Sequence, residues 1–169
     1  MQQMSGAIRR VDTGMAGMGL FLSHMPGRYG PLDPMLAEMA RIGIDEVISL
    51  APLAEIGLKS PAYAGLLDRG DLAWGFRVVP VEDFGIPEDR VAYAAEVERA
   101  ASDLLGGRRL LVHCGAGIGR TGTFALCVLA ALGIPSGEAS LAVSSAGSGP
   151  ETDAQSELVD WMRRRFPEV

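Results

Sequence analysis

The chain has 169 residues, of which 48% are hydrophobic and 21% are charged, and its formal net charge is −6 at pH 7. This size and composition predict a globular domain whose core needs neither metal nor disulfide. The negative charge argues against a nucleic-acid-binding protein and against one that rests on anionic lipid. Cys114 and Cys127 are the only cysteines and form neither a disulfide framework nor a CxxC metal site. We therefore expect a reducing, cytoplasmic compartment and a monomer.

Strand-like and helix-like segments alternate along the chain, and nothing in the sequence divides it into two domains. We expect a single domain over residues 1–169, in which the Met-rich start, residues 1–18, packs on the domain or forms a loose extension. In chain order the predicted elements are a strand at 20–23, a helix at 34–43, a strand at 45–50, a helix at 60–70, a strand at 76–82, a helix at 87–107, a strand at 109–114, and helices at 120–132, 136–145 and 152–166. This order predicts an α/β fold: a mostly parallel central sheet of about five strands, flanked by helices on both faces.

The segment VHCGAGIGRTG, residues 112–122, joins the last predicted strand to an almost wholly apolar helix. A glycine-rich turn before a helix start collects backbone N–H groups around an anion, and the helix dipole favours negative charge there. Arg120 adds a planar guanidinium that can hold two phosphate oxygens. The same positive field acts on Cys114. The loop therefore predicts an ionised thiolate at the floor of an anion cradle, which suits nucleophilic attack on phosphorus.

The sequence HCGAGIGRTG, with a His-Cys pair, five residues, an arginine and then Thr-Gly, resembles the signature of the cysteine-dependent protein tyrosine phosphatase superfamily. The chain length and the small, neutral residues within the loop point to its dual-specificity branch. Over roughly residues 19–166, from GLFLSHMPGRYGPLDPMLAEMARIGIDEVISL to ELVDWMRRRF, the chain resembles the cyclin-dependent-kinase-associated phosphatase subgroup. The resemblance implies hydrolysis of phosphomonoesters without a cofactor or metal.

The resemblance also implies roles for the residues of the signature. Cys114 would be the nucleophile that forms a cysteinyl-phosphate, and Arg120 would bind the phosphoryl group. His113 would hydrogen-bond the loop and help to keep the thiolate ionised, and the Thr121 hydroxyl would ease departure of the sulfur. The phosphate would be cradled by Gly115, Ala116, Gly117, Ile118, Gly119 and Arg120.

Two further roles lie outside the signature. The leaving oxygen needs a proton from a general acid, which this superfamily carries on an upstream loop. The segment VEDFGIPED, residues 81–89, matches that loop, and Asp83 is the candidate, with Glu82 and Asp89 as weaker rivals. Strand alternation is expected to turn Glu82 away, and Asp89 is expected to fall inside the following helix. Gln155 is the candidate that positions the hydrolytic water, although the basic residue that many relatives carry before it is absent here.

The sequence leaves the substrate open. We expect phosphotyrosine proteins and, in a shallow pocket, phosphoserine or phosphothreonine proteins. An inositol-phosphate or phosphoinositide phosphatase is the alternative enzyme, although relatives of that kind tend to place lysines inside the loop, where this chain has Ala116 and Ile118. A phosphoprotein-binding module without turnover is the alternative from a different class.

Overall fold

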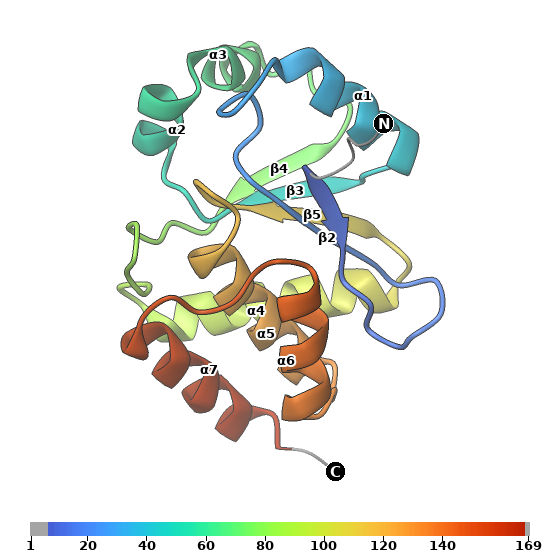
Figure 1. Cartoon of the computed structure of the whole chain (residues 1–169), viewed down its shortest axis with the longest axis vertical. Helices are drawn as coiled ribbons and strands as arrows, with labels where there is room; N and C mark the ends of the chain where they lie inside the picture. The colour runs from blue at the N-terminus through green and yellow to red at the C-terminus, as the bar shows by residue number, and fades with distance from the viewer. Residues whose placement is uncertain (1–6, 168–169) are drawn as a thin grey trace.

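The computed structural model describes residues 7–167, and its centre is a five-stranded sheet with the order β1-β2-β5-β3-β4 (Figure 1). The strands are β1 (Ile8–Arg10), β2 (Gly19–Ser23), β3 (Glu46–Ser49), β4 (Gly75–Val78) and β5 (Arg109–His113). Only β1 is antiparallel, at the edge beside β2, and the other four strands are parallel. The predicted mostly parallel sheet is confirmed.

Seven helices cover the two faces of the sheet. They are α1 (Leu32–Ile42), α2 (Leu53–Lys59), α3 (Pro61–Arg69), α4 (Arg90–Leu105), α5 (Gly119–Ala131), α6 (Ser136–Ser145) and α7 (Asp153–Arg165). Figure 1 shows α1, α2 and α3 on one side of the sheet and α4 to α7 on the other. None of the helices in the described part of the chain combines the length and the apolar character needed to cross a membrane.

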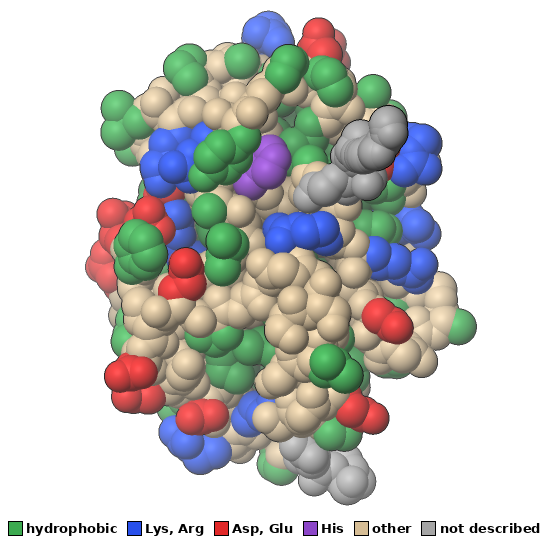
Figure 2. Space-filling view, viewed as in Figure 1, with side chains coloured by type: hydrophobic (Ala, Val, Ile, Leu, Met, Phe, Trp, Pro, Cys, Tyr) green, Lys and Arg blue, Asp and Glu red, His purple; other side chains and the backbone are tan. Residues whose placement is uncertain are grey.

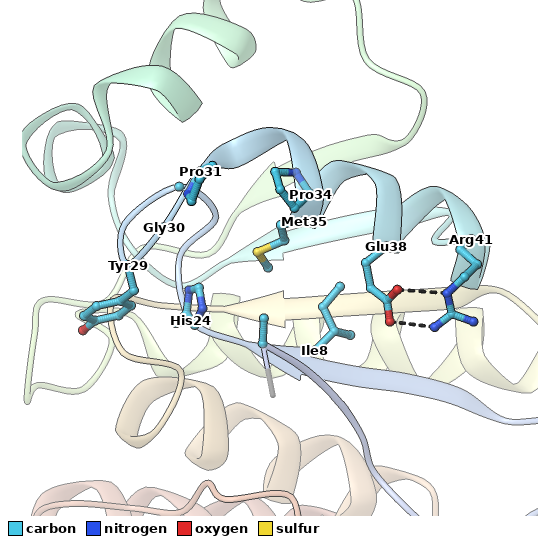
Figure 3. Close-up of a pocket in the computed structure, with 11 residues that line it drawn as sticks. Ile8, His24, Tyr29, Gly30, Pro31, Pro34, Met35, Glu38 and Arg41 are labelled. Atoms are coloured by element: carbon cyan, nitrogen blue, oxygen red, sulfur yellow. Dashed lines mark hydrogen bonds and ion pairs between the residues drawn. The ribbon is translucent and has the colours of Figure 1, made fainter. Parts of the chain in front are cut away.

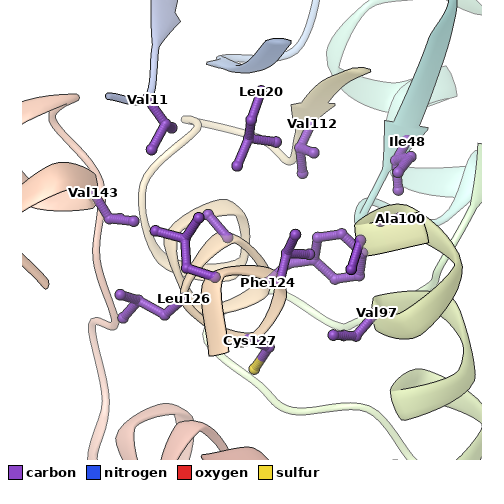
Figure 4. Packing of buried hydrophobic residues seen from close by; sticks show 14 of the residues in the cluster. Val11, Leu20, Ile48, Val97, Ala100, Val112, Phe124, Leu126, Cys127 and Val143 are labelled. Atoms are coloured by element: carbon purple, nitrogen blue, oxygen red, sulfur yellow. The ribbon is translucent and has the colours of Figure 1, made fainter. Parts of the chain in front are cut away.

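The main core lies between the sheet and α5. Figure 4 shows Leu20 and Val112 of the strands facing Phe124 of this helix, with Cys127 and, on α4, Val97 farther from the strands. All but the last residue of α5 are buried, because the sheet covers one side of the helix and α4, α6 and α7 pack around the rest. A helix that is apolar all round belongs in such a central position.

The N-terminal region is better ordered than a loose extension. Arg9 of β1 pairs with Leu22 of β2, and Val11 and Met18 are buried in the main core. Of the two alternatives for residues 1–18, packing on the domain agrees with these contacts, and residues 1–6 lie outside the described part. A three-residue edge strand with two arginines has too little apolar alternation to be recognised from sequence.

Three more features differ from the predicted elements. The strand expected at 76–82 ends at Val78, and the helix expected at 87–107 begins at Arg90 because the Asp89 side chain accepts hydrogen bonds from the N–H groups of Val91 and Ala92. Asp89 is thus the N-cap of α4 and not a residue within the helix. Helix α2 was not predicted, since it is short and exposes Leu58.

Candidate active site

Three parallel strands end side by side where the loop from His113 to Arg120, called the signature loop below, begins. His113 at the end of β5 lies in register with Ser23 of β2 and Ser49 of β3, and all three side chains are fully buried. Met25, just after β2, donates its N–H to the carbonyl of Gly115 at 3.0 Å. The signature loop therefore lies beyond the carboxyl ends of the strands, where α/β folds bind their ligands.

Cys114 and Arg120 occupy the two ends of this loop. Cys114 is a free, buried thiol, and Arg120 in the first turn of α5 is only 3% exposed. Burial by itself lowers the pKa of Arg120, but hydrogen bonds to Glu55 and the nearby Cys114 charge raise it above its ordinary value. The guanidinium is therefore a permanent positive charge beside the candidate nucleophile.

Glu55 of α2 forms a bidentate ion pair with this guanidinium. Its Oε1 accepts from Nη1 of Arg120 at 2.8 Å and its Oε2 from Nη2 at 2.7 Å, and the carbonyl of Val81 also accepts from Nη1 at 2.8 Å. Burial alone would raise the pKa of Glu55, but hydrogen bonds from Arg120 and Lys59 lower it to about 2. The Nε–H of Arg120 is buried and has no partner among the described residues. The ion pair with Glu55 therefore leaves one donor of Arg120 for a bound anion.

The sequence reasoning missed Glu55. The only local signal is the i,i+4 spacing of Glu55 and Lys59, whose side chains form an ion pair at 2.8 Å. That spacing is common on exposed helices and carries no indication of a distant arginine.

Among the three acidic residues considered for the loop after β4, Asp83 is the one that reaches the signature loop. Its Oδ1 lies 3.2 Å from Nη2 of Arg120 and its Oδ2 lies 3.5 Å from Nζ of Lys59, while 47% of the side chain stays exposed. Asp89 is committed to capping α4. Glu82 is exposed and forms no ion pair within the described residues. Of the three, Asp83 is therefore the one that lies beside Arg120.

His113 is fully buried and lies between two polar partners. Its Nδ1 is 3.1 Å from the carbonyl of Cys114 and its Nε2 is 2.8 Å from the hydroxyl of Tyr63 on α3. Because a carbonyl only accepts, Nδ1 carries the proton and Nε2 accepts from Tyr63. Burial lowers the pKa of His113 to about 4 and raises that of Tyr63, so the imidazole is neutral and the phenol is protonated. This chain of hydrogen bonds fixes the carbonyl at the start of the signature loop.

The remaining signature residues divide into backbone and side-chain positions. Ala116 and Ile118 expose their side chains, so they can contribute only main-chain groups to the floor of the loop. A methyl group on Gly117, whose φ is 78°, would lie 2.4 Å from the carbonyl oxygen of Ser23, which requires glycine there. Thr121 is fully buried, and its hydroxyl has no partner among the described residues. That hydroxyl is free to interact with a ligand or with a charged sulfur.

Gln155 at the start of α7 is buried and spans two loops. Its Oε1 accepts from the N–H of Glu151 at 2.8 Å, and its Nε2 donates to the carbonyl of Gly85 at 3.1 Å. Gly85 lies two residues after Asp83. The amide therefore holds the loop of Asp83 against the segment before α7, which in turn contacts the signature loop through Gly149 N and Ile118 O at 3.2 Å.

Several solved structures are similar to this chain in fold. Kinase associated phosphatase (KAP), solved with a serine in place of its catalytic-site cysteine, has a TM-score of 0.79 and 20% identity over 98% of each chain. Tk-PTP in its active form has a TM-score of 0.73 and 22% identity over 96% of this chain and 99% of its own. PTPMT1, solved in complex with PI(5)P, has a TM-score of 0.71 and 16% identity over 94% and 96% of the two chains. No curated protein matches the sequence.

These structural likenesses, all below 25% identity, establish the dual-specificity phosphatase fold. The family follows from the sequence of the chain itself, because residues 33–167 match the model of the DSP-PTPase phosphatase domain of Swiss Army Knife proteins. That range contains the signature loop, Glu55, Asp83 and Gln155. The chain belongs to this family of dual-specificity-type phosphatase domains, and it resembles KAP as the sequence indicated.

Proposed function

We propose that the protein hydrolyses phosphotyrosine, and also phosphoserine and phosphothreonine, in protein substrates through a cysteinyl-phosphate on Cys114. The observation that carries the proposal is the clamped guanidinium: Glu55 orients Arg120 beside a buried free thiol, and the Nε–H of Arg120 has no partner among residues 7–167. A fixed donor at the place where charge develops is the most effective stabilisation available to an enzyme, since it needs no reorganisation during the reaction.

In the first step the Cys114 thiolate attacks phosphorus, and the bond from phosphorus to the leaving oxygen breaks. Arg120 and the main chain of the signature loop stabilise the equatorial oxygens, while the Asp83 carboxylic acid gives its proton to the leaving oxygen. Asp83 lies on the flank of Arg120, with its Oδ1 3.2 Å from Nη2. We expect the incoming phosphate to take that place and to free Asp83 for the leaving group.

In the second step water attacks the cysteinyl-phosphate, and the sulfur departs as a thiolate. Asp83, now a carboxylate, accepts the proton of the water, and the unpartnered hydroxyl of Thr121 donates to the departing sulfur. Gln155 is the candidate for positioning that water. Because both polar atoms of its amide already bind Gly85 and Glu151, a role in holding the Asp83 loop is equally part of the proposal.

Protein substrates are favoured over inositol phosphates by the surroundings of the loop. The outward-facing side chains within the signature loop are Ala116 and Ile118, which carry no charge. Lys59 is the only lysine of the chain, and its ammonium pairs with Glu55 and Asp83. No lysine is therefore left to bind a second phosphate of a polyol.

The test is phosphate release from p-nitrophenyl phosphate in metal-free buffer with EDTA. The wild type should turn over, Cys114→Ser should not, and Cys127→Ala, which alters the other cysteine in the core, should keep the activity. Retention of activity in Cys114→Ser would exclude the mechanism. An inactive wild type that still binds vanadate or a phosphopeptide would instead support a binding module, and preferential turnover of inositol phosphates over phosphopeptides would support the alternative enzyme.

A further inference from the structure

Arg28 lies against the signature loop and forms no ion pair with a carboxylate of the described residues. A methyl group on Gly115 would lie 2.7 Å from Nη1 of Arg28, 3.1 Å from Nζ of Lys59 and 3.2 Å from Oε2 of Glu55, so two cations and one carboxylate reach the residue that follows Cys114. Lys59 is neutralised by Glu55 and Asp83, whereas Arg28 forms no ion pair within the described part of the chain. Its charge therefore remains available to an anion on a ligand.

The turn that carries Arg28 is fixed to the site from two sides. Met25 N binds Gly115 O, and Arg28 N closes the turn onto Met25 O at 3.2 Å. From the start of α3, the hydroxyl of Ser60 donates to the carbonyl of Pro26 at 2.8 Å. Because the turn is already held in place, binding of an anion to Arg28 carries little free-energy cost for ordering the backbone.

Tyr29 holds the Arg28 side chain without neutralising it. The guanidinium carbon lies 4.7 Å from the centre of the Tyr29 ring, a cation–π arrangement. Figure 2 shows that Lys and Arg side chains flank the histidine on this face, although acidic residues outnumber basic ones by 21 to 15 in the whole chain. Basic side chains therefore line the surface next to the histidine, and acidic side chains lie beside them at the left of the view (Figure 2).

A hollow of about 480 Å³ adjoins the same turn (Figure 3). His24 and Tyr29 form one wall, Ile8 and Met35 lie in its middle, and the ion pair of Glu38 with Arg41 closes the other end. The wall also touches the signature loop, since a methyl group on Gly117 would lie 2.7 Å from His24 N. The chain between β2 and α1 therefore separates the phosphate site from a largely apolar cavity.

We propose that Arg28 and this hollow form a recognition subsite for the peptide that flanks the phosphorylated residue. Arg28 pairs with an acidic side chain next to that residue, and the hollow takes an apolar side chain farther along. The subsite rests on the proposed phosphatase function. A peptide fits better than a polyol phosphate, because a peptide alone can supply an anion beside the phosphate and an apolar group beyond it.

The experiment measures kcat/KM on three matched phosphotyrosine peptides. The first has acidic residues on both sides of the phosphotyrosine and apolar residues beyond them, the second replaces the acidic residues by alanine, and the third replaces the apolar residues by serine. The enzymes are the wild type, Arg28→Gln, Arg28→Lys and, as a control with the same charge change in an exposed arginine near the end of α7, Arg164→Gln.

The wild type should prefer the first peptide over the second by about five-fold, which corresponds to about 1 kcal/mol for a partly exposed ion pair. The preference should vanish in Arg28→Gln, persist in part in Arg28→Lys, persist fully in Arg164→Gln, and shrink as salt is added. The third peptide should be a poorer substrate than the first for every enzyme, because it leaves the hollow empty.

Equal turnover of the first two peptides by the wild type, or the same preference in Arg28→Gln, would overturn the subsite and leave the phosphatase function standing. An Arg28-dependent preference for a sugar bisphosphate over a sugar monophosphate, with none among the peptides, would overturn the assignment to peptides. Absence of turnover on every substrate would instead refute the proposed function, and the subsite would fall with it.

Discussion

Replacing Glu55 by glutamine tests the clamp on Arg120. The glutamine has the same shape and keeps one oxygen acceptor, so one of the two hydrogen bonds at 2.7 and 2.8 Å and the negative charge are lost. A hydrogen bond to a charged group contributes about 1.5–3 kcal/mol. Because Arg120 is buried, a loss of about 2–3 kcal/mol should reach the transition state nearly intact and lower kcat/KM roughly 30- to 150-fold.

The assay compares kcat/KM of Glu55→Gln with that of Glu82→Gln, which removes an exposed carboxylate of the neighbouring loop that forms no ion pair within the described residues. Glu82→Gln should stay close to the wild type. A thermal melt of both variants separates misfolding from misorientation of Arg120. The reasoning would be refuted by a folded Glu55→Gln whose kcat/KM stays within about three-fold of the wild type, since the clamp would then add less than 1 kcal/mol.

Three other predictions concern the general acid, the buried histidine and a close backbone approach in the core. Asp83→Asn should slow the hydrolysis of phenyl phosphate far more than that of substrates with acidic leaving groups. Gln155→Leu should show the same pattern if the Gln155 amide holds the Asp83 loop. If cysteinyl-phosphate instead accumulates in Gln155→Leu with every leaving group, Gln155 positions the water. Unfolded histidine binds protons near pH 6.5 but native His113 only near pH 4, so lowering the pH through this window should cost the wild type about 3 kcal/mol of unfolding free energy by pH 4. In urea melts His113→Asn should lose the part of the slope between pH 6.5 and pH 5, above the range in which carboxylates such as Glu55 contribute, and equal slopes there would contradict the prediction. Gly122→Ala would place a methyl group 2.1 Å from the backbone nitrogen of Gly149, so its melting temperature should fall clearly. Gly137→Ala, with open space around it in α6, should melt at the wild-type temperature or slightly above it, because alanine favours a helix.

The sequence predicted the parts of the site that are local in the chain. Cys114 and Arg120 stand in one short loop between a buried strand and a buried helix, so their spacing and context alone indicate their proximity. Asp83 was a candidate only because the segment VEDFGIPED resembles the general-acid loop of the superfamily, and the structure places its carboxylate 3.2 Å from Arg120. The parallel sheet followed from the alternation of strand and helix patterns, which is strongest in the buried elements.

The contacts that the sequence did not predict are those made between distant segments. Glu55 meets Arg120 across 65 positions of the chain and only because α2 follows β3 at the same edge of the sheet. Arg28 depends on a turn whose hydrogen bonds come from Gly115 and Ser60. Periodicity carries no information about such contacts, since short, polar segments bury too little apolar surface to leave a pattern.

The most direct test of the mechanism is to look for the covalent intermediate. The enzyme is mixed with excess p-nitrophenyl phosphate, quenched within milliseconds and digested. The mass of the peptide that contains Cys114 is then measured by mass spectrometry. We predict the added mass of one phosphoryl group on Cys114 in the wild type and none in Cys114→Ser. An active wild type whose Cys114 peptide never carries phosphate, or carries it on another residue, would contradict the cysteinyl-phosphate mechanism.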